Sequence, residues 1–350
     1  MALNLFAPKS KLGIDIGTAS IKIVELEKKS GRFVLDNYGI FELKNVKIPT
    51  SVDQSILKLP DEEIIWGIKE VLKSSKINAK DVIASIPSFS TFATVIELPY
   101  LSEQELAKAI PFEARKYVPI PLDEVILDWS IIGITGTGPK PTVEVFLAAV
   151  PKDETVRYQG IMSGAGLNLK ALELENSALI RGLLGNDLST TAVINIGGRS
   201  TSILIVDKGY ERLSHNYEVG GFEITKSIAR SLNVSLEKAD DLKKRLGLKD
   251  LDENIINQAM LSLIDMMAFE TKKTISSYEQ SKNKQVARVL LVGGMVNMPN
   301  FLNYFKEKLG RDVFLGNAFA RVTYPPGLQP VIQELSSTFA VAAGLAMRDI

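Results

Sequence analysis

The chain has 350 residues, 45% hydrophobic and 23% charged, which is an ordinary globular composition but long for one hydrophobic core. Its 41 basic and 41 acidic residues cancel, so nucleic acid is not an expected partner. The absence of cysteine excludes disulfides and thiol nucleophiles, and the single histidine, His215, argues against a histidine triad or metal site. No apolar run reaches the length of a membrane span, so we expect a cytoplasmic protein without direct membrane insertion.

The first predicted elements are strands. Residues 11–43 are rich in Val and Ile and are interrupted at Gly17 and Ser30, which predicts three successive strands in a meander. The segment DEEIIWGIKEVLKSSK predicts an amphipathic helix with Asp61 as its N-cap. Two strands closed by proline follow, at 82–87 and 92–99.

The next segment predicts one helix, two strands and a second helix. Ser102 and Glu105 match a capping box, Pro111 is expected to kink or split the helix that they begin, and VPIP at 118–121 ends it. VILDWSII and VEVFLAAV predict strands that are joined by the loop GITGTGPKP. KDETVRYQGIMSGAG then predicts a helix that ends in glycine.

The second half of the chain repeats the first. When LGIDIGTASIKIVEL is laid over AVINIGGRSTSILIV, Asp15 falls on Asn195 and Gly17 on Gly197. This duplication predicts two α/β lobes with a ligand-binding cleft between them. The second copy predicts another meander, helices at 221–232, 235–246 and 252–281, a strand–diglycine–helix unit in VARVLLVGGMVNMPNFLNYFKEKLG and a final helix in SSTFAVAAGLAMR.

The first glycine turn has the groups that suit a phosphate. Asp15 ends the strand before the turn and is suited to hold a water on Mg²⁺, and Lys22 on the return strand is suited to contact a phosphate. Successive backbone N–H groups in such a turn form an anion-binding nest. The residues expected to form this nest are Gly17, Thr18, Ala19 and Ser20.

The second turn and a later diglycine complete the predicted site. Because NIGGRST repeats the first turn, two hairpins can hold a polyphosphate from both sides. A strand that ends in a diglycine suits a flat base lying on bare backbone. The residues expected to contact a nucleotide here are Asn195, Gly197, Gly198, Thr201, Gly293, Gly294 and Met295.

These motifs together resemble a known superfamily. D-x-G-T-x-x-x-K, the repeated I-G-G turn and L-V-G-G-x-x-x-x-P resemble the phosphate and adenosine motifs of actin, heat-shock protein 70 and the sugar kinases. The resemblance implies an actin-like, ribonuclease H-like α/β fold whose duplicated lobes bind Mg-ATP in a cleft. It also implies that Glu175 positions the attacking water and that Asp240 and Lys243 contact the ribose and base. Asn195 stands where the superfamily usually has a metal-side aspartate, so we expect ATP binding with at most slow hydrolysis.

A longer segment narrows the resemblance. VIASIPSFSTFATVIELPYLSEQELAKAIPFEARKYVPIPLDEVILDW is similar to a subdomain, called 1C, of the PilM-like type IV pilus assembly family and of the cell-division protein FtsA. The resemblance implies a cytoplasmic protein held at the inner membrane through its partner. It implies binding of the cytoplasmic N-terminal tail of PilN in a groove between subdomains 1A and 1C, and contact with other pilus platform proteins. An FtsA-like division protein and a small-molecule kinase of the same superfamily are the alternatives.

The same resemblance implies a division into four parts. Lobe 1 consists of 1A and 1C, and lobe 2 consists of 2A and 2B. The expected ranges are 1–81, 151–190 and 331–350 for 1A, 82–150 for 1C, 191–218 and 283–330 for 2A, and 219–282 for 2B. Within 1C we expect most of the aromatic residues to be ordinary core, namely Phe89, Phe92, Phe112, Tyr117 and Trp129.

Overall fold

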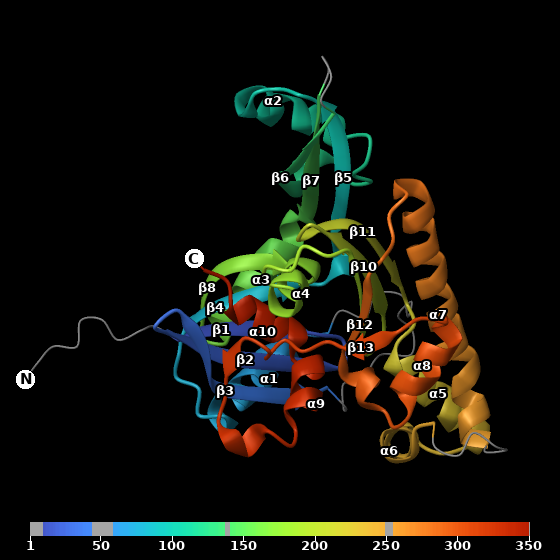
Figure 1. Ribbon diagram of the computed structural model, residues 1–350. Coiled ribbons are helices and arrows are strands. Elements are labelled where there is room, and N and C mark those ends of the chain that lie inside the picture. The colour runs from blue at the N-terminus through green and yellow to red at the C-terminus, as the bar shows by residue number, and fades with distance from the viewer. Residues whose placement is uncertain (1–9, 44–58, 137–140, 249–254, 350) are drawn as a thin grey trace, which may run out of the picture.

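The computed structural model describes residues 10–43, 59–136, 141–248 and 255–349. It contains two large sheets and a small one, with helices on and between them (Figure 1). The small sheet projects from the rest of the molecule (Figure 1). Among the helices in these ranges, none has the length and apolar character needed to cross a membrane.

The first large sheet is built around β1. This strand pairs antiparallel with β2 and parallel with β4, in the sheet order β14-β3-β2-β1-β4-β8. The meander predicted at 11–43 is confirmed as the first three strands. The strands are β1 (Lys11–Ile16), β2 (Ser20–Lys29), β3 (Arg32–Glu42), β4 (Asp81–Ile86), β8 (Asn168–Leu174) and β14 (Val322–Thr323).

The second large sheet repeats this topology. Its order, β11-β10-β9-β12-β13, matches β3-β2-β1-β4-β8 strand for strand, with the same antiparallel and parallel pairs around the central strand. The duplication seen in the sequence is therefore confirmed in the fold. The strands are β9 (Thr191–Ile196), β10 (Thr201–Asp207), β11 (Tyr210–Tyr217), β12 (Arg288–Val292) and β13 (Val313–Leu315).

The small sheet is antiparallel and has its own core. Its order is β5-β7-β6, and one face is packed against helix α2 (Glu103–Ala114). Buried Leu106 and Ile110 of the helix meet Val145 and Leu147 of the central strand. The strands are β5 (Phe92–Pro99), β6 (Val125–Thr135) and β7 (Thr142–Pro151).

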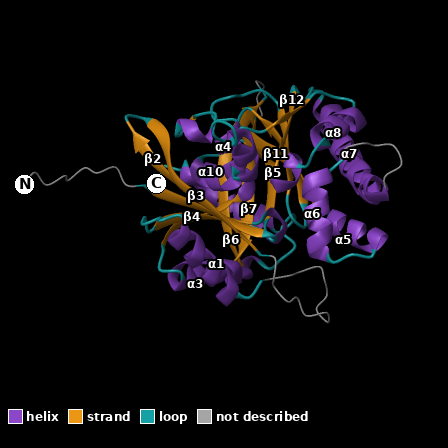
Figure 2. Cartoon of the chain, turned by 90° about the horizontal axis from the view of Figure 1, so that it is seen from below, coloured by secondary structure: helices purple, strands orange, loops and turns teal. Residues whose placement is uncertain are grey.

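Helices form three layers: one on the first large sheet, one between the two large sheets, and one on the second large sheet. Seen from below, α1 (Asp61–Ser74) and α3 (Lys152–Gly164) lie together at one side of the first sheet (Figure 2), where their apolar side chains share a core with that sheet. Helices α4 (Glu175–Leu183) and α10 (Ala340–Ala346) share a core with both large sheets. The layer on the second large sheet is made by α5 (Gly221–Leu232), α6 (Leu236–Leu246), α7 (Ile255–Lys282) and α8 (Phe301–Leu309), and α9 (Ile332–Thr338) precedes α10.

Pro111 does not split α2, contrary to the expectation. The helix runs through it, and the predicted capping box is confirmed, with the Ser102 backbone N–H donating to Glu105 Oε2 at 2.9 Å. Pro111 and Ala107 both lie on the exposed side of the helix. The Ala107 carbonyl, which loses its intrahelical donor at Pro111, can therefore bond to water at little cost.

Several predicted boundaries need correction. Pro60 is the N-cap of α1, and Asp61 is its first helical residue, where a carboxylate favours the helix dipole. The C-terminal helix is two helices, because the chain leaves helical geometry at Phe339 between α9 and α10. The helix predicted at 252–281 is described from Ile255, and its first predicted residues lie outside the described ranges.

The aromatic residues of the 82–150 segment are less buried than expected. Phe89, Phe112 and Tyr117 are 53%, 67% and 43% exposed, so the prediction of ordinary core is wrong for them. Phe92 and Trp129 do pack against the core of the small sheet. Apolar periodicity alone could not separate the two groups, because it does not show what lies opposite each ring.

Helix α10 comes unusually close to its neighbours through glycine. A Cβ built at Gly13 of β1 would lie 2.0 Å from the Ala342 carbonyl oxygen, and one built at Gly344 would lie 1.9 Å from the Ala178 carbonyl oxygen. Both obstacles are backbone atoms of packed elements, so they cannot rotate away as a side chain would. The layer between the two large sheets therefore depends on these two glycines.

Gly344→Ala should destabilise the protein by about 1–3 kcal/mol or more, because it forces α10 and α4 apart. Gly160→Ala is the matched control, since this glycine also lies in a helix but has no atom near its built Cβ. The control should stabilise by roughly 0.5–1 kcal/mol through helix propensity. Urea unfolding of both variants checks this, and equal stabilities would contradict the close-packing argument.

Candidate functional site

The two glycine turns have the same hydrogen bond. The Gly17 N–H donates to the Ser20 carbonyl at 3.0 Å, and the Gly197 N–H donates to the Ser200 carbonyl at 2.9 Å. Each turn follows the central strand of its sheet, β1 or β9. The sequence repeat is thus a repeat of one turn geometry.

The two turns touch each other. A Cβ built at Gly198 would lie 2.4 Å from the Ala19 Cβ and 3.4 Å from Thr18 Oγ1. Only glycine at this position permits so close an approach. The structure therefore brings the two predicted phosphate cradles together, although they lie half a chain apart in sequence.

The first turn is flanked by a charged pair. Asp15 and Lys22 are register partners on β1 and β2, and Lys22 Nζ lies 3.3 Å from Asp15 Oδ2. The Ser85 hydroxyl, from β4, donates to Asp15 Oδ1 at 3.4 Å. Both charged side chains are largely buried, so the pair is fixed in place at the entrance to the turn.

The second turn is flanked by a neutral pair. Asn195 and Ser202 are register partners on β9 and β10, in the places that Asp15 and Lys22 hold in the first sheet. The replacement of Asp15 by Asn195 in the second copy was evident from the sequence, but the replacement of Lys22 by Ser202 was missed. The sequence repeat does show it, since Lys22 aligns with Ser202. The second turn has therefore lost a matched pair of charges rather than a single acid.

The diglycine lies against the second turn. A Cβ built at Gly293, whose φ is +101°, would lie 2.2 Å from the Ile196 carbonyl oxygen and 3.0 Å from Asn195 Oδ1. Gly293 is thus required by both conformation and space. By contrast, nothing lies within 4 Å of a Cβ built at Gly294. This backbone is open, as a surface for a flat ring would need to be.

Glu175 begins helix α4 near the first turn. Its Oε2 accepts a hydrogen bond from the Ser88 backbone N–H at 3.3 Å and from the Ser88 hydroxyl at 3.4 Å. Loss of solvent, together with the negative charge of Asp15, raises the pKa of Glu175 from 4.5 to about 7. The carboxylates of Asp15 and Glu175 thus lie near the first turn, and Glu175 can exchange a proton near neutral pH.

A line of hydrogen bonds leads away from Glu175. The Ser88 hydroxyl lies 3.2 Å from Asn176 Oδ1, and Asn176 Nδ2 donates to Glu211 Oε2 of β11 at 3.1 Å. The next residue, Arg212, donates to Glu144 Oε2 of the small sheet at 2.7 Å. This line was missed from the sequence, because its members come from four distant segments and form no local motif.

Asp240 and Lys243 join helices α6 and α5. Lys243 Nζ lies 2.9 Å from Asp240 Oδ1, and it donates to Thr225 Oγ1 at 2.7 Å and to the Gly221 carbonyl at 3.0 Å. Burial lowers the pKa of Lys243. Although burial alone would raise it, the pKa of Asp240 is lowered by Lys243 and Lys244.

Helix α5 connects these residues to the second turn. The Gly221 and Phe222 N–H groups donate to the carbonyls of Gly197 and Gly198 at 3.0 and 2.7 Å. A Cβ built at Gly221 would lie 3.6 Å from both Lys243 Nζ and Met295 Sδ. Lys243 and Met295, predicted from separate motifs, therefore meet beside the second turn.

Thr201 is the predicted residue that points elsewhere. It is fully buried, and its hydroxyl donates to the Val219 carbonyl at 2.7 Å. Its side chain thus ties β10 to the segment before α5.

Glu175→Gln should stabilise the protein more at pH 8 than at pH 5. The folded-state pKa of about 7 lies above the ordinary value of 4.5, so stability contributed by this group is complete at low pH and is lost as the pH rises through about 7. The glutamine amide stays neutral at every pH, so the variant does not lose this stability as the pH rises. Melting temperatures between pH 5 and 8 check this, with exposed Glu307→Gln as the charge control. A difference that does not grow with pH would contradict the raised pKa.

Comparisons with known proteins agree with this geometry. The sequence profile of the family described as "Type IV pilus assembly protein PilM" matches residues 13–350. The chain is also 22% identical to the cell division protein FtsA of Enterococcus faecalis, over 95% of this chain and 83% of that protein. FtsA of Bacillus subtilis is 23% identical, over 86% of this chain and 77% of that protein.

Solved structures share the fold. A structure described as a PilM–PilN type IV pilus biogenesis complex superposes with a TM-score of 0.82 and 22% identity, over 97% of this chain and 98% of that chain. MreB5 of Spiroplasma citri, bound to ADP, has a TM-score of 0.51 and 14% identity, over 96% and 94% of the two chains. The duplicated sheets, the paired turns and these similarities show an actin-like α/β fold, and the match of the family profile over residues 13–350 shows that the chain belongs to the PilM family of type IV pilus assembly proteins.

Proposed function

We propose that this chain binds Mg-ATP beside the two glycine turns where they meet. The contact of Gly198 with Ala19 and Thr18 carries the proposal, because the two turns meet there and the backbone N–H groups of both could face one phosphate chain. Lys22 supplies a positive charge there, and the open backbone at Gly294 suits the adenine ring. Lys243 and Met295 form the neighbouring wall, where Asp240 fixes the lysine in place.

Asp15 fits a magnesium ion that is held through water. The described part of the chain contains no group of three or more His, Cys, Asp or Glu side chains that could hold a metal directly. Mg²⁺ does not need one, since it keeps several waters and binds through one or two carboxylates plus phosphates. When bound, it would neutralise phosphate charge next to a carboxylate that is already fixed by Lys22 and Ser85.

We propose that hydrolysis is slow. Glu175 is suited to position and deprotonate a water, because its pKa of about 7 lets it accept a proton near neutrality. The Asn195–Ser202 pair, however, supplies no carboxylate beside the second turn. The site therefore favours retention of the nucleotide over its turnover.

Lys22→Ala should weaken ATP binding about tenfold or more, because a charge-assisted contact to phosphate is lost. Exposed Lys29→Ala, on the same strand, is the matched control and should bind as the wild type does. Isothermal titration with ATP and Mg²⁺ measures both. Equal affinities would place the phosphates elsewhere, and wild-type turnover at the rate of a typical kinase would contradict the role given to Asn195.

We further propose that the chain binds the cytoplasmic N-terminal tail of a PilN-like protein at the inner membrane, together with other pilus platform proteins. The family assignment and the likeness to a solved PilM–PilN complex support this over an FtsA-like role in division. The tail would lie between the small sheet and the first large sheet. Phe89 follows β4 at that junction, is 53% exposed and adjoins Ser88, which contacts Glu175.

The proposed division into parts follows the sheets. Because β4 belongs to the first large sheet, we move the start of 1C from residue 82 to residue 87. Residues 82–86 then pass to 1A, which becomes 1–86, 151–190 and 331–350. The ranges 191–218 and 283–330 for 2A and 219–282 for 2B stay as proposed from the sequence, except that β14 within 283–330 pairs with β3 of the first sheet.

Phe89→Ala should weaken binding of an apolar PilN-like N-terminal peptide about tenfold or more, as expected for an aromatic anchor. Phe314→Ala is the matched control, since Phe314 is also 53% exposed but lies on β13. Fluorescence titration with and without Mg-ATP measures this. No wild-type binding in either condition would overturn the partner, whereas equal affinity in both would show that the nucleotide does not control peptide binding.

A further inference from the structure

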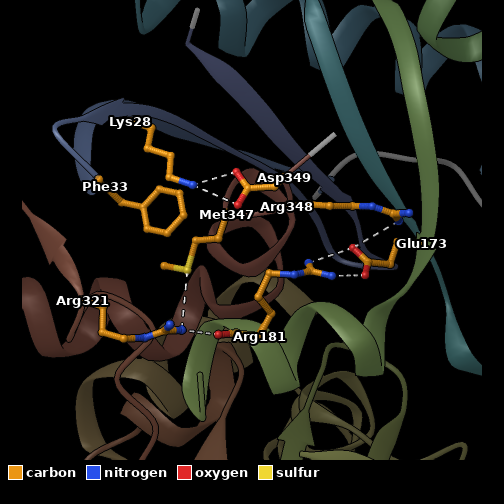
Figure 3. A pocket seen from close by; sticks show the side chains of 9 residues that line it. Lys28, Phe33, Glu173, Arg181, Arg321, Met347, Arg348 and Asp349 are labelled. Atoms are coloured by element: carbon orange, nitrogen blue, oxygen red, sulfur yellow. Dashed lines mark hydrogen bonds and ion pairs between the residues drawn. The ribbon is translucent and has the colours of Figure 1, made fainter. Parts of the chain in front are cut away.

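A polar cavity lies outside the two turns. It has a volume of about 540 Å³ and is lined by the far end of β2, the end of β8 that leads into helix α4, α4 itself, Arg321 and the C-terminal residues 347–349 (Figure 3). Lys28 of the lining is eight residues along β2 from Ser20, which corresponds to roughly 26 Å in a strand. The cavity and the proposed nucleotide site share no residue, and they come nearest along the chain at Glu173, two residues before Glu175.

The lining carries an excess of positive charge. Four cations and two carboxylates face this space, which leaves two positive charges unmatched. The cations are Lys28, Arg181, Arg321 and Arg348, and the carboxylates are Glu173 and Asp349.

Both carboxylates are already engaged. Glu173 accepts from both terminal nitrogens of Arg181, one of them at 2.9 Å, and lies 3.7 Å from Arg348 Nη1. Asp349 accepts two hydrogen bonds from Lys28 Nζ, at 3.0 and 2.9 Å. Figure 3 shows the Lys28–Asp349 pair above Met347 and the Glu173 group to its right.

Arg321 has no carboxylate partner within the described ranges. Its Nη2 donates to the Arg181 carbonyl and, at 3.4 Å, to the Gly182 carbonyl, both at the end of α4. Burial lowers its pKa, with no nearby acid to oppose the shift. The helix dipole offsets only part of the charge. Arg321 thus caps the C-terminal end of α4 through Nη2 alone. Its Nε and Nη1 donate to no described residue and could donate to a ligand.

The place of Arg321 is built into the backbone. A Cβ at Gly185 would lie 2.6 Å from Arg321 Cζ, and this glycine also has a φ of +57°. The Arg321 guanidinium therefore packs directly against the Gly185 backbone, where no side chain on residue 185 would fit. A preorganised guanidinium loses little freedom when it binds an oxyanion.

We propose that this cavity binds a phosphate group. A phosphate monoester carries about two negative charges at pH 7, which equals the unmatched charge of the lining, whereas a carboxylate carries one. Arg321 and Arg348 present planar donors that suit phosphate oxygens. Phe33 and Met347 in the lining give an apolar flank, which suits either a free phosphate compound or the head group of an anionic phospholipid.

Two experiments test the proposal. The first titrates inorganic phosphate into the full chain and monitors binding by phosphorus NMR. The second compares flotation of the chain with phosphatidylglycerol vesicles and with phosphatidylcholine vesicles. We expect binding in at least one arm, weakened about tenfold or more by Arg321→Gln. Arg348→Gln, which loses only the 3.7 Å ion pair, should also weaken it. Arg230→Gln, which removes an exposed charge on α5, is the control and should bind as the wild type does.

The two arms separate the sources of the phosphate. Binding of phosphate without vesicle preference assigns a free phosphate ligand, and preference for phosphatidylglycerol without measurable phosphate binding assigns a lipid head group. No binding in either arm would overturn the proposal. Unchanged binding by folded Arg321→Gln and Arg348→Gln proteins would equally overturn it, because the phosphate would then lie elsewhere.

Discussion

Helix α10 can lie against both β1 and α4 because neither Gly13 nor Gly344 has a Cβ. The same layer fills the space between the two large sheets, and its core contains side chains of β2, such as Val24, and of β10, such as Leu204. Since each sheet is packed on this common layer, their central strands are fixed relative to each other. The turns that follow β1 and β9 then meet at Gly198, where again only glycine fits. The candidate site thus depends on three close backbone contacts, at Gly13, Gly344 and Gly198, each of which requires glycine.

Within this nearly symmetric frame, charge is distributed unevenly. Asp15 and Lys22 form an ion pair in the first sheet, and Asn195 and Ser202 form a neutral pair at the same register in the second. Losing both members together leaves no unpaired buried charge, which would have been costly. The second sheet therefore keeps its glycine turn without a buried ion pair beside it. Under the proposed function, this combination favours a nucleotide that is retained over one that is rapidly hydrolysed.

Much of this could be predicted from sequence because it repeats locally. The alternation around Gly17 and Gly197, the capping box at Ser102 and the diglycine each specify a strand, turn or cap within a few residues. What could not be predicted rests on contacts between distant segments. The line from Glu175 through Ser88 and Asn176 to Glu211 is one example, and the exposure of Phe112 is another, since both depend on which surfaces meet. Pro111 was misjudged because the cost of a proline depends on whether water reaches the carbonyl it leaves free.

Hydrogen–deuterium exchange with and without Mg-ATP tests the central claim most directly, because it reports protection at each backbone amide without any substitution. We predict that Mg-ATP slows exchange in residues 15–22, 195–201 and 293–295, which the structure brings together at the two turns and the diglycine. Absence of protection in all three segments, or protection confined to one turn, would contradict the claim that both lobes bind a single nucleotide.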